Sequence, residues 1–308
     1  MRIVDFHTHF FARPFFDALA GLSPLPGDVS EKLDLIRQRT GIEIPPADLG
    51  EHLSRWLGEL DDKGVEHLVT FASIPEETDA VAEAAARSAG RITPMALANP
   101  RADGAADAVR SLLGEKGFKG VLLFPAMHHF HVGGPECRAV FQALDDAGAV
   151  AYVHCGLLVV KLRDLLGIPR PYDLSFANPL GVIPAANAFP NVKFVIPHFG
   201  AGFFRETLMA GIQCPNVYVD TSSTNSWVAT QPAPLTLTDV FDRALGAFGV
   251  DRILFGTDSN VFPAGWRVER FEEQRTILGN LALTVEDQQK IFAGNADTVL
   301  GRAPHETD

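Results

Sequence analysis

Short apolar runs alternate with longer amphipathic stretches along most of the chain. The runs are rich in Val, Ile, Leu and Phe and carry few polar residues. This pattern is typical of strands that are covered on both faces, as in a parallel sheet. The eight runs are Ile3–Phe6, His67–Phe71, Ile92–Leu97, Gly120–Phe124, Val150–His154, Val192–Pro197, Val217–Asp220 and Arg252–Gly256.

The stretches between these runs have the apolar spacing that predicts helices. The predicted helices are Glu76–Ala89, Asp103–Glu115, Glu136–Ala147, Pro179–Phe189, Phe204–Ile212, Thr238–Phe248 and Thr284–Ala293, the last ending near Gly294. Eight strands alternating with helices favour a closed (β/α)8 TIM barrel over an open sheet. No GxGxxG motif follows the first run, which argues against a dinucleotide fold. We therefore predict one barrel domain spanning residues 1–308.

The connection after the first strand is too long for an ordinary strand-to-helix loop. It runs from about Arg13 to Lys63, and we predict two helices in it, near Ser30–Thr40 and Leu49–Lys63. The loops 156–178 and 222–235 are also long. A helical insertion at this place often forms a lid over the barrel mouth.

Composition narrows the range of functions. The chain has 308 residues, of which 46% are hydrophobic and 21% charged, a balance typical of a globular protein. Its formal net charge is −12. A negatively charged surface repels phosphate groups, which disfavours binding to nucleic acids and to anionic membranes. The expected partner is therefore a small-molecule substrate. The sequence is also compatible with a homo-oligomer. Three cysteines without a CxxC motif, no signal peptide and no membrane-length apolar run predict a cytoplasmic protein.

The first strand ends in a pair of histidines. His7 and His9 are two residues apart, so their side chains share one face of a strand. Asp5 is expected on that face one layer deeper, where it either orients a ligand or is satisfied inside the barrel. At the carboxyl end of a barrel strand the inward face carries the catalytic groups. Two imidazoles at this place can chelate one metal ion, although so short a motif also occurs where a loop merely begins.

Three other apolar runs end in polar residues with the same chemistry. His154 ends the fifth run, His198 the sixth and Asp258 follows the eighth. Because strand ends converge on the barrel mouth, these residues are expected to meet there. His7, His9, His154 and Asp258 supply three nitrogens and one carboxylate, which suits a catalytic Zn²⁺ site, although Mn²⁺, Fe²⁺ or Ni²⁺ also fit. His198 is expected beside the metal as an acid, a base or an electrostatic group.

The ordered motifs resemble the amidohydrolase superfamily, in the branch that contains aminocarboxymuconate-semialdehyde decarboxylase. The resemblance covers nearly the whole chain. It implies a distorted (β/α)8 barrel, metal binding by His7, His9, His154 and Asp258, and a catalytic His198. The motifs that carry it are DFHTHF, YVHCG, FANPLG, FPNVKFVIPHFGAG, NVYVDTSS, RILFGTDSN and KIFAGNADTVLG.

The fourth run predicts a single metal ion per chain. Binuclear members of the superfamily carry a carboxylated lysine at the end of the fourth strand, where it bridges two metals. Here Phe124 and Pro125 stand at that end, and Lys119 precedes the strand.

Several further residues are candidates for contact with the substrate. His128 comes soon after the fourth run, Arg205 follows the His198 motif, and Trp266 and Arg267 follow Asp258. Arg267 can bind a carboxylate through two hydrogen bonds from its guanidinium group. For each of these residues, a solvent-facing or structural role is the competing interpretation. Asp220, with Ser222 or Ser223, is expected to supply supporting hydrogen bonds.

The sequence leads to a main hypothesis and two alternatives. The main hypothesis is a mononuclear metal-dependent hydrolase acting on a small carboxylated substrate or a cyclic ester or amide, with His198 and Asp258 as catalytic residues. The close alternative is a metal-dependent non-oxidative decarboxylase that uses the same residues. The outside alternative is a non-catalytic barrel stabilised by a metal, which would leave His198 without a purpose.

Overall fold

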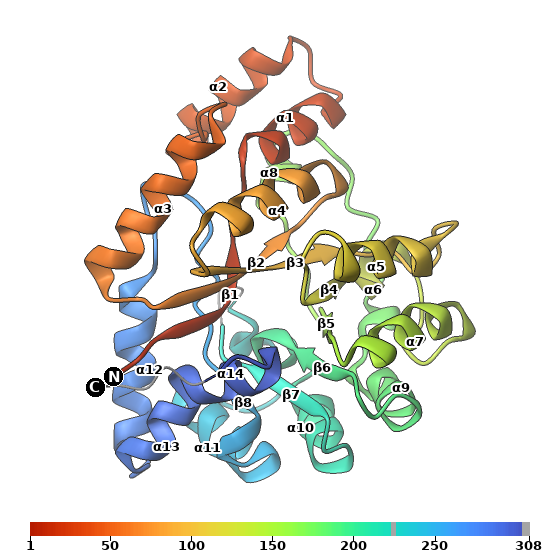
Figure 1. Cartoon of the computed structure of the whole chain (residues 1–308), viewed down its shortest axis with the longest axis vertical. Coiled ribbons are helices and arrows are strands. Elements are labelled where there is room, and N and C mark those ends of the chain that lie inside the picture. Colours follow the sequence, from red (N-terminus) through yellow and green to blue (C-terminus); the bar gives the residue numbers. More distant parts are fainter. Residues whose placement is uncertain (223–225, 304–308) are drawn as a thin grey trace.

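A barrel of eight parallel strands forms the centre of the molecule (Figure 1). The computed structural model describes residues 1–222 and 226–303. Each strand pairs with the next in chain order, and the barrel closes between β8 and β1, where Phe6 N donates to Phe255 O at 2.8 Å. The predicted TIM barrel is therefore confirmed. The strands are β1 Val4–His9, β2 His67–Ala72, β3 Ile92–Leu97, β4 Gly120–Leu123, β5 Val150–Val153, β6 Lys193–Ile196, β7 Val217–Asp220 and β8 Ile253–Leu254.

Every predicted apolar run overlaps a strand, as expected for a sheet that is covered on both faces. The inner face packs Phe6, Phe71 and Tyr152 into a cluster inside the barrel. The outer face packs against the surrounding helices in a larger cluster. β1 continues three residues beyond the predicted Phe6 and so includes both histidines of the first motif.

The helices surround the strands (Figure 1), and those predicted between consecutive strands are present. The predicted end near Gly294 is wrong, because Gly294 has helical backbone angles and the chain continues through a π-helical turn into α14. α12 was not predicted, since its sequence VERFEEQRTILGN is mostly polar. The helices are α4 Thr78–Arg87, α5 Ala105–Gly114, α6 Pro125–His128, α7 Arg138–Ala147, α8 Lys161–Leu165, α9 Val182–Ala188, α10 Phe204–Gln213, α11 Leu237–Phe248, α12 Val268–Asn280, α13 Val285–Gln289 and α14 Asn295–Leu300.

The insertion after β1 holds three helices rather than the two predicted. They are α1 Arg13–Leu22, α2 Val29–Thr40 and α3 Leu49–Lys63. The missed helix, α1, begins with Pro14 in its first turn and buries Phe15 and Phe16. Those rings pack with Leu166 from the loop after β5, so the insertion and that loop share one apolar cluster.

In the part of the chain that the structure describes, no helix combines the length and the apolar character needed to cross a bilayer.

Candidate metal centre

His7 points into the barrel because β1 changes register beside it. The pairing of β1 with β2 shifts between Asp5 and Thr8, and such a bulge redirects the neighbouring side chains. The His7 ring lies 5.4 Å from the Tyr152 ring, between centroids, in the interior. Asp5 instead accepts a hydrogen bond of 2.8 Å from the indole Nε1 of Trp266, in the outer cluster. The prediction that Asp5 shares the face of His7 is therefore wrong, because strict alternation does not hold across the bulge.

A buried carboxylate orients the His7 imidazole. Asp220 ends β7, is fully buried, and its Oδ2 accepts a hydrogen bond of 2.7 Å from His7 Nδ1. Since an ionised carboxylate only accepts, the proton is on Nδ1, and the Nε2 lone pair of His7 is left for a metal. Oδ1 of the same carboxylate accepts the backbone N–H groups of His198 and Ser222, both at 2.9 Å. Asp220 thus holds one histidine ring and the backbone of a second.

His198 follows β6 in a turn of left-handed backbone. The φ angles of His198, Phe199 and Gly200 are 55°, 52° and 87°. Left-handed backbone costs a residue with a side chain about 1 kcal/mol or more, and such strain gathers at functional sites. His198 Nδ1 donates to the Ser222 carbonyl at 2.9 Å. Because a carbonyl only accepts, Nε2 of His198 carries a free lone pair when the ring is neutral.

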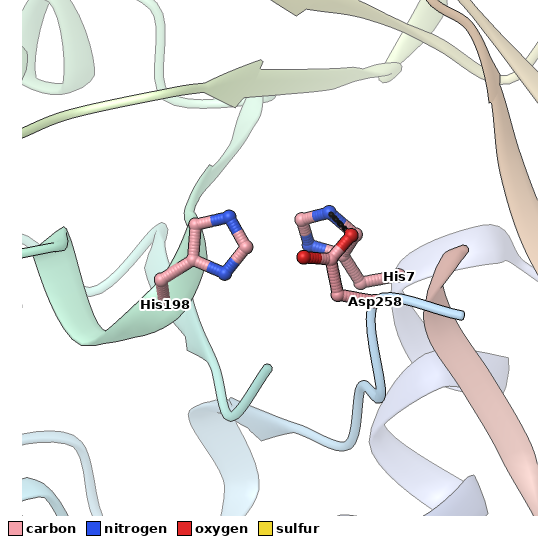
Figure 2. A group of neighbouring side chains, drawn as sticks. All are labelled: His7, His198 and Asp258. Atoms are coloured by element: carbon pink, nitrogen blue, oxygen red, sulfur yellow. Dashed lines mark ion pairs between the residues drawn. The ribbon is translucent and has the colours of Figure 1, made fainter. Parts of the chain in front are cut away.

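Asp258 brings a carboxylate against two histidines. It follows β8 with a φ of 57°, and its backbone N–H donates to the His7 carbonyl at 2.8 Å. Its Oδ1 lies 3.4 Å from His9 Nε2 and 3.7 Å from His7 Nε2. Figure 2 shows Asp258 beside the His7 ring, with His198 facing both. The potential ligand atoms of His7, His198 and Asp258 all lie within 4.8 Å of one another, a separation at which one ion can bind several of them.

His9 and His154 flank this group. His9 Nδ1 is hydrogen-bonded to the Ser73 hydroxyl at 2.8 Å, which leaves Nε2 directed at Asp258. The His154 ring lies 5.3 Å from the His198 ring, between centroids. His154 Nδ1 is buried and has no hydrogen-bond partner among the described residues. An unpaired buried nitrogen costs about 1 to 3 kcal/mol, and coordination of a metal would explain it.

The backbone comes unusually close to His7 at Gly256. A Cβ placed on Gly256 would lie 2.8 Å from the Cβ of His7 and 3.2 Å from that of Ser222. Such distances are shorter than van der Waals contact, so only glycine fits without moving His7. The predicted β8 run therefore ends in a residue that the site itself requires.

The protonation states of the cluster suit a cation. Burial lowers the pKa of His154 to about 4, and it also lowers the pKa values of His9 and His198. Burial opposes the charge on His7 too, but the neighbouring carboxylates outweigh it and raise the pKa of that ring. Burial alone would raise the pKa of Asp258, but the hydrogen bond with His9 and the charge of His7 hold it below its ordinary value. Neutral imidazoles and ionised carboxylates are the forms that bind metals. His9, His154, His198 and Asp258 therefore favour the binding form, whereas an ion at His7 would have to displace the proton that the carboxylates favour on that ring.

Two of the four residues expected to contact the substrate, Trp266 and Arg205, lie where such a contact is not expected. Trp266 is 1% exposed, and its indole nitrogen donates to Asp5. The Arg205 side chain is 84% exposed on α10 and pairs with the adjacent Glu206 at 2.6 Å. Neither has the placement expected of a residue that lines a pocket, because one is enclosed in the outer layer and the other extends into solvent.

The other two keep a placement compatible with contact to a substrate. His128 ends α6 directly after β4 and is half-buried, and its Nδ1 has no hydrogen-bond partner in the described ranges. Arg267 precedes α12 and lies near enough to His9 for its charge to lower the pKa of that ring.

The supporting groups were found only in part from the sequence. Asp220 and Ser222 supply hydrogen bonds as expected, whereas Ser223 lies outside the described residues. Tyr152 was missed, although its hydroxyl is 2.9 Å from His7 Nδ1. Its position on β5, two residues before His154, is a signal that could have identified it. Ser73 offered no comparable signal.

Comparison with known proteins agrees with the resemblance seen in the sequence. The family model described as amidohydrolase matches residues 4–302. The chain belongs to the amidohydrolase family. No curated protein matches its sequence.

Solved structures share this amidohydrolase fold at low sequence identity. An uncharacterized TIM-barrel protein from Bordetella bronchiseptica is 21% identical with a TM-score of 0.68, covering 98% of this chain and 99% of that one. The 5-carboxyvanillate decarboxylase of Novosphingobium aromaticivorans, complexed with manganese and 4-hydroxy-3-methoxy-5-nitrobenzoic acid, is 15% identical with a TM-score of 0.65, covering 97% and 96%. A probable 2-pyrone-4,6-dicarboxylic acid hydrolase from Acinetobacter baumannii is 14% identical with a TM-score of 0.60, covering 98% and 100%. At these identities the likeness concerns the fold.

Proposed function

We propose that this amidohydrolase-family protein is a metal-dependent hydrolase in which His7, His9, His154 and Asp258 hold one divalent ion. The observation that carries the proposal is the buried Nδ1 of His154, which has no hydrogen-bond partner among the described residues, beside two histidines whose Nε2 atoms face Asp258. Three imidazoles and a carboxylate suit Zn²⁺, and Mn²⁺, Fe²⁺ and Ni²⁺ accept the same donors. An ion there would supply a Lewis acid that lowers the pKa of water toward about 7 and polarises a carbonyl.

One ion per chain is proposed because β4 offers no bridging group at the barrel mouth. The strand ends at Leu123 and is followed by Phe124. Lys119 precedes the strand, and its backbone N–H donates to the Pro94 carbonyl, so it lies at the opposite end of the barrel.

Two residues of the chain act on the attacking water, one by accepting a hydrogen bond from it and the other by accepting its proton. The neutral His198 ring offers the Nε2 lone pair to a water that attacks the substrate, because Nδ1 is committed to the Ser222 carbonyl. An Asp258 oxygen accepts the proton that this water loses and returns it to the leaving group. An unprotonated Nε2 favours hydrolysis over a reaction in which His198 must donate a proton to carbon.

The substrate proposed is small and either carboxylated or a cyclic ester or amide. Arg267 near His9 supplies a guanidinium that can bind a carboxylate through two hydrogen bonds. His128 contributes a half-buried ring nitrogen with no partner in the described part of the chain. These are the two of the four expected substrate contacts whose placement is compatible with that role.

Non-oxidative decarboxylation is the second candidate function. Arg267 favours it as well, because a decarboxylase must also hold a carboxylate. The manganese-containing 5-carboxyvanillate decarboxylase shares the fold. The two reactions differ in their products: hydrolysis incorporates oxygen from ¹⁸O-labelled water without release of CO₂, whereas decarboxylation releases CO₂.

The first experiment is elemental analysis of protein purified without added metal. We expect about one transition-metal equivalent per chain, lost in the double variant His7→Ala/His9→Ala. A matched control is His129→Ala/His131→Ala, which removes two histidines from the loop after β4 and should keep the metal. Protein that holds no metal and takes up none on reconstitution would refute the proposal. A metal-loaded protein is then given lactones, amides and aromatic carboxylates, and the products are analysed as above.

A further inference from the structure

A buried carboxylate outside the ligand set bridges two segments beside the metal centre. Glu77 ends the short 3₁₀ helix Pro75–Glu77 after β2 and is 0% exposed. One oxygen accepts the Ala12 backbone N–H at 2.7 Å, and the other accepts the Ser73 backbone N–H at 3.0 Å. None of the described residues forms an ion pair with it. Burial raises the pKa of Glu77 to about 8, because its two hydrogen bonds offset only part of the cost of burying its charge.

Both donors to Glu77 adjoin groups that contact His9. The Ser73 hydroxyl is hydrogen-bonded to His9 Nδ1 at 2.8 Å. Ala12 follows Phe11, whose ring stacks on the His9 ring at 4.8 Å between centroids and 15° between planes. The carboxylate therefore connects to the edge of the His9 ring through Ser73 and to its face through Phe11.

The turn that carries Phe11 needs such support. Phe11 has a φ of 42°, a left-handed conformation that costs a bulky residue about 1 to 2 kcal/mol. The hydrogen bond from Ala12 to Glu77 fixes the backbone immediately after this strained residue. The other face of the Phe11 ring is covered by Phe15 of α1, at 4.0 Å between centroids.

We propose that Glu77 is a positioning residue that fixes the His9 imidazole for metal binding. By holding Ser73 it keeps His9 Nδ1 hydrogen-bonded, and by holding Ala12 it keeps the Phe11 ring against the imidazole. His9 Nε2 then stays directed toward Asp258. The inference rests on the proposed function, because it assumes that His9 is a metal ligand.

The test is the metal affinity of Glu77→Gln. The amide has one accepting oxygen, so one of the two backbone N–H groups loses its acceptor. We expect the Zn²⁺ dissociation constant, measured by competition with a chelating indicator, to rise about tenfold, as for other groups that orient metal ligands. The visible spectrum of the Co²⁺-loaded protein should also shift, which a loss of stability alone would not cause.

Asp297→Asn is the matched control. Asp297 is a carboxylate only 3% exposed, and it forms an ion pair of 2.9 Å with Arg2, which precedes β1 at the end of the barrel opposite the mouth. Both variants should lower the free energy of unfolding, but Asp297→Asn should keep the Zn²⁺ affinity and the Co²⁺ spectrum. A folded Glu77→Gln protein with affinity within about twofold of wild type would overturn the inference.

Ser73→Ala provides an independent test if Glu77→Gln does not fold. It keeps the backbone N–H that Glu77 accepts and removes the hydroxyl that His9 uses. We expect weaker Zn²⁺ binding, and an unchanged affinity would overturn the inference. If wild-type protein and both variants bind metal equally well, the role of Glu77 is refuted and the proposed function is not. Wild-type protein without metal affinity would overturn both.

Discussion

Replacing Asp220 with asparagine should change which nitrogen of His7 carries the proton. Oδ1 of Asp220 accepts two backbone N–H groups and the Ser222 hydroxyl, whereas Oδ2 accepts, among the described residues, only His7 Nδ1. The single oxygen of the asparagine amide is best placed on the side with three donors. Its NH₂ group then faces His7 Nδ1, so the two groups would both be donors unless the ring moves its proton to Nε2.

The size of the effect follows from this change of tautomer. A proton on Nε2 removes the lone pair that His7 offers to a metal. Loss of a group that orients a ligand typically weakens metal binding about 10- to 100-fold, which corresponds to about 1.4 to 2.8 kcal/mol. The effect should fall at the upper end, because the hydrogen bond is short, at 2.7 Å, and fully buried.

The assay is competition for Zn²⁺ with a chelating indicator at neutral pH, together with ¹⁵N NMR of the histidine tautomers in metal-free protein. Tyr152→Phe is the control, since it removes a hydroxyl 2.9 Å from the same nitrogen but leaves the carboxylate. Its affinity should stay within about threefold of wild type. A folded Asp220→Asn protein that binds Zn²⁺ as tightly as wild type would refute the reasoning.

Three further changes test other parts of the structure. Trp266→Phe removes a hydrogen bond to the buried Asp5 and should lower the free energy of unfolding in urea by about 1.5 to 3 kcal/mol, and a change under about 0.5 kcal/mol would count against the assigned role. Gly256→Ala should destabilise by about 1 to 3 kcal/mol and weaken Zn²⁺ binding, because its methyl group would press on His7, and wild-type affinity would contradict this. Burial lowers the pKa of His67 from 6.5 to about 3, so neutral His67 contributes stability that is present above pH 6.5 and lost as the pH falls. The advantage of wild type over His67→Gln in free energy of unfolding should therefore shrink by about 3 kcal/mol between neutral pH and about pH 4, and a constant difference would exclude this role.

The strands were predictable because burial on both faces leaves a strong apolar signal. Helices were predictable where one face is apolar. α12 was not predicted because few of its residues are buried, among them Phe271 and Leu278, and most of the others are polar or charged. α1 escaped because its phenylalanines lie directly after the first strand and do not stand out as a separate helix.

The histidines and Asp258 were predictable because each interrupts or follows an apolar run at the same end of the barrel. Their supports depend on contacts between distant segments, such as Ser73 with His9, which no local pattern encodes. The structure does not support the substrate contact expected at Trp266 for a similar reason, because local sequence does not determine where the side chain points. Position after β8 indicated proximity to the mouth, but only the packed structure shows that its indole turns outward to Asp5.

The left-handed backbone at His198 and Asp258 also determines which substitutions are informative. Histidine and aspartate are among the few residues other than glycine that adopt this conformation readily, and asparagine is another. An alanine scan would combine the loss of the side chain with a change in backbone energy at both positions. Asparagine keeps the backbone preference and removes the imidazole or the charge. For anyone who maps this barrel by mutation, asparagine is therefore the substitution that separates chemistry from folding at these two positions.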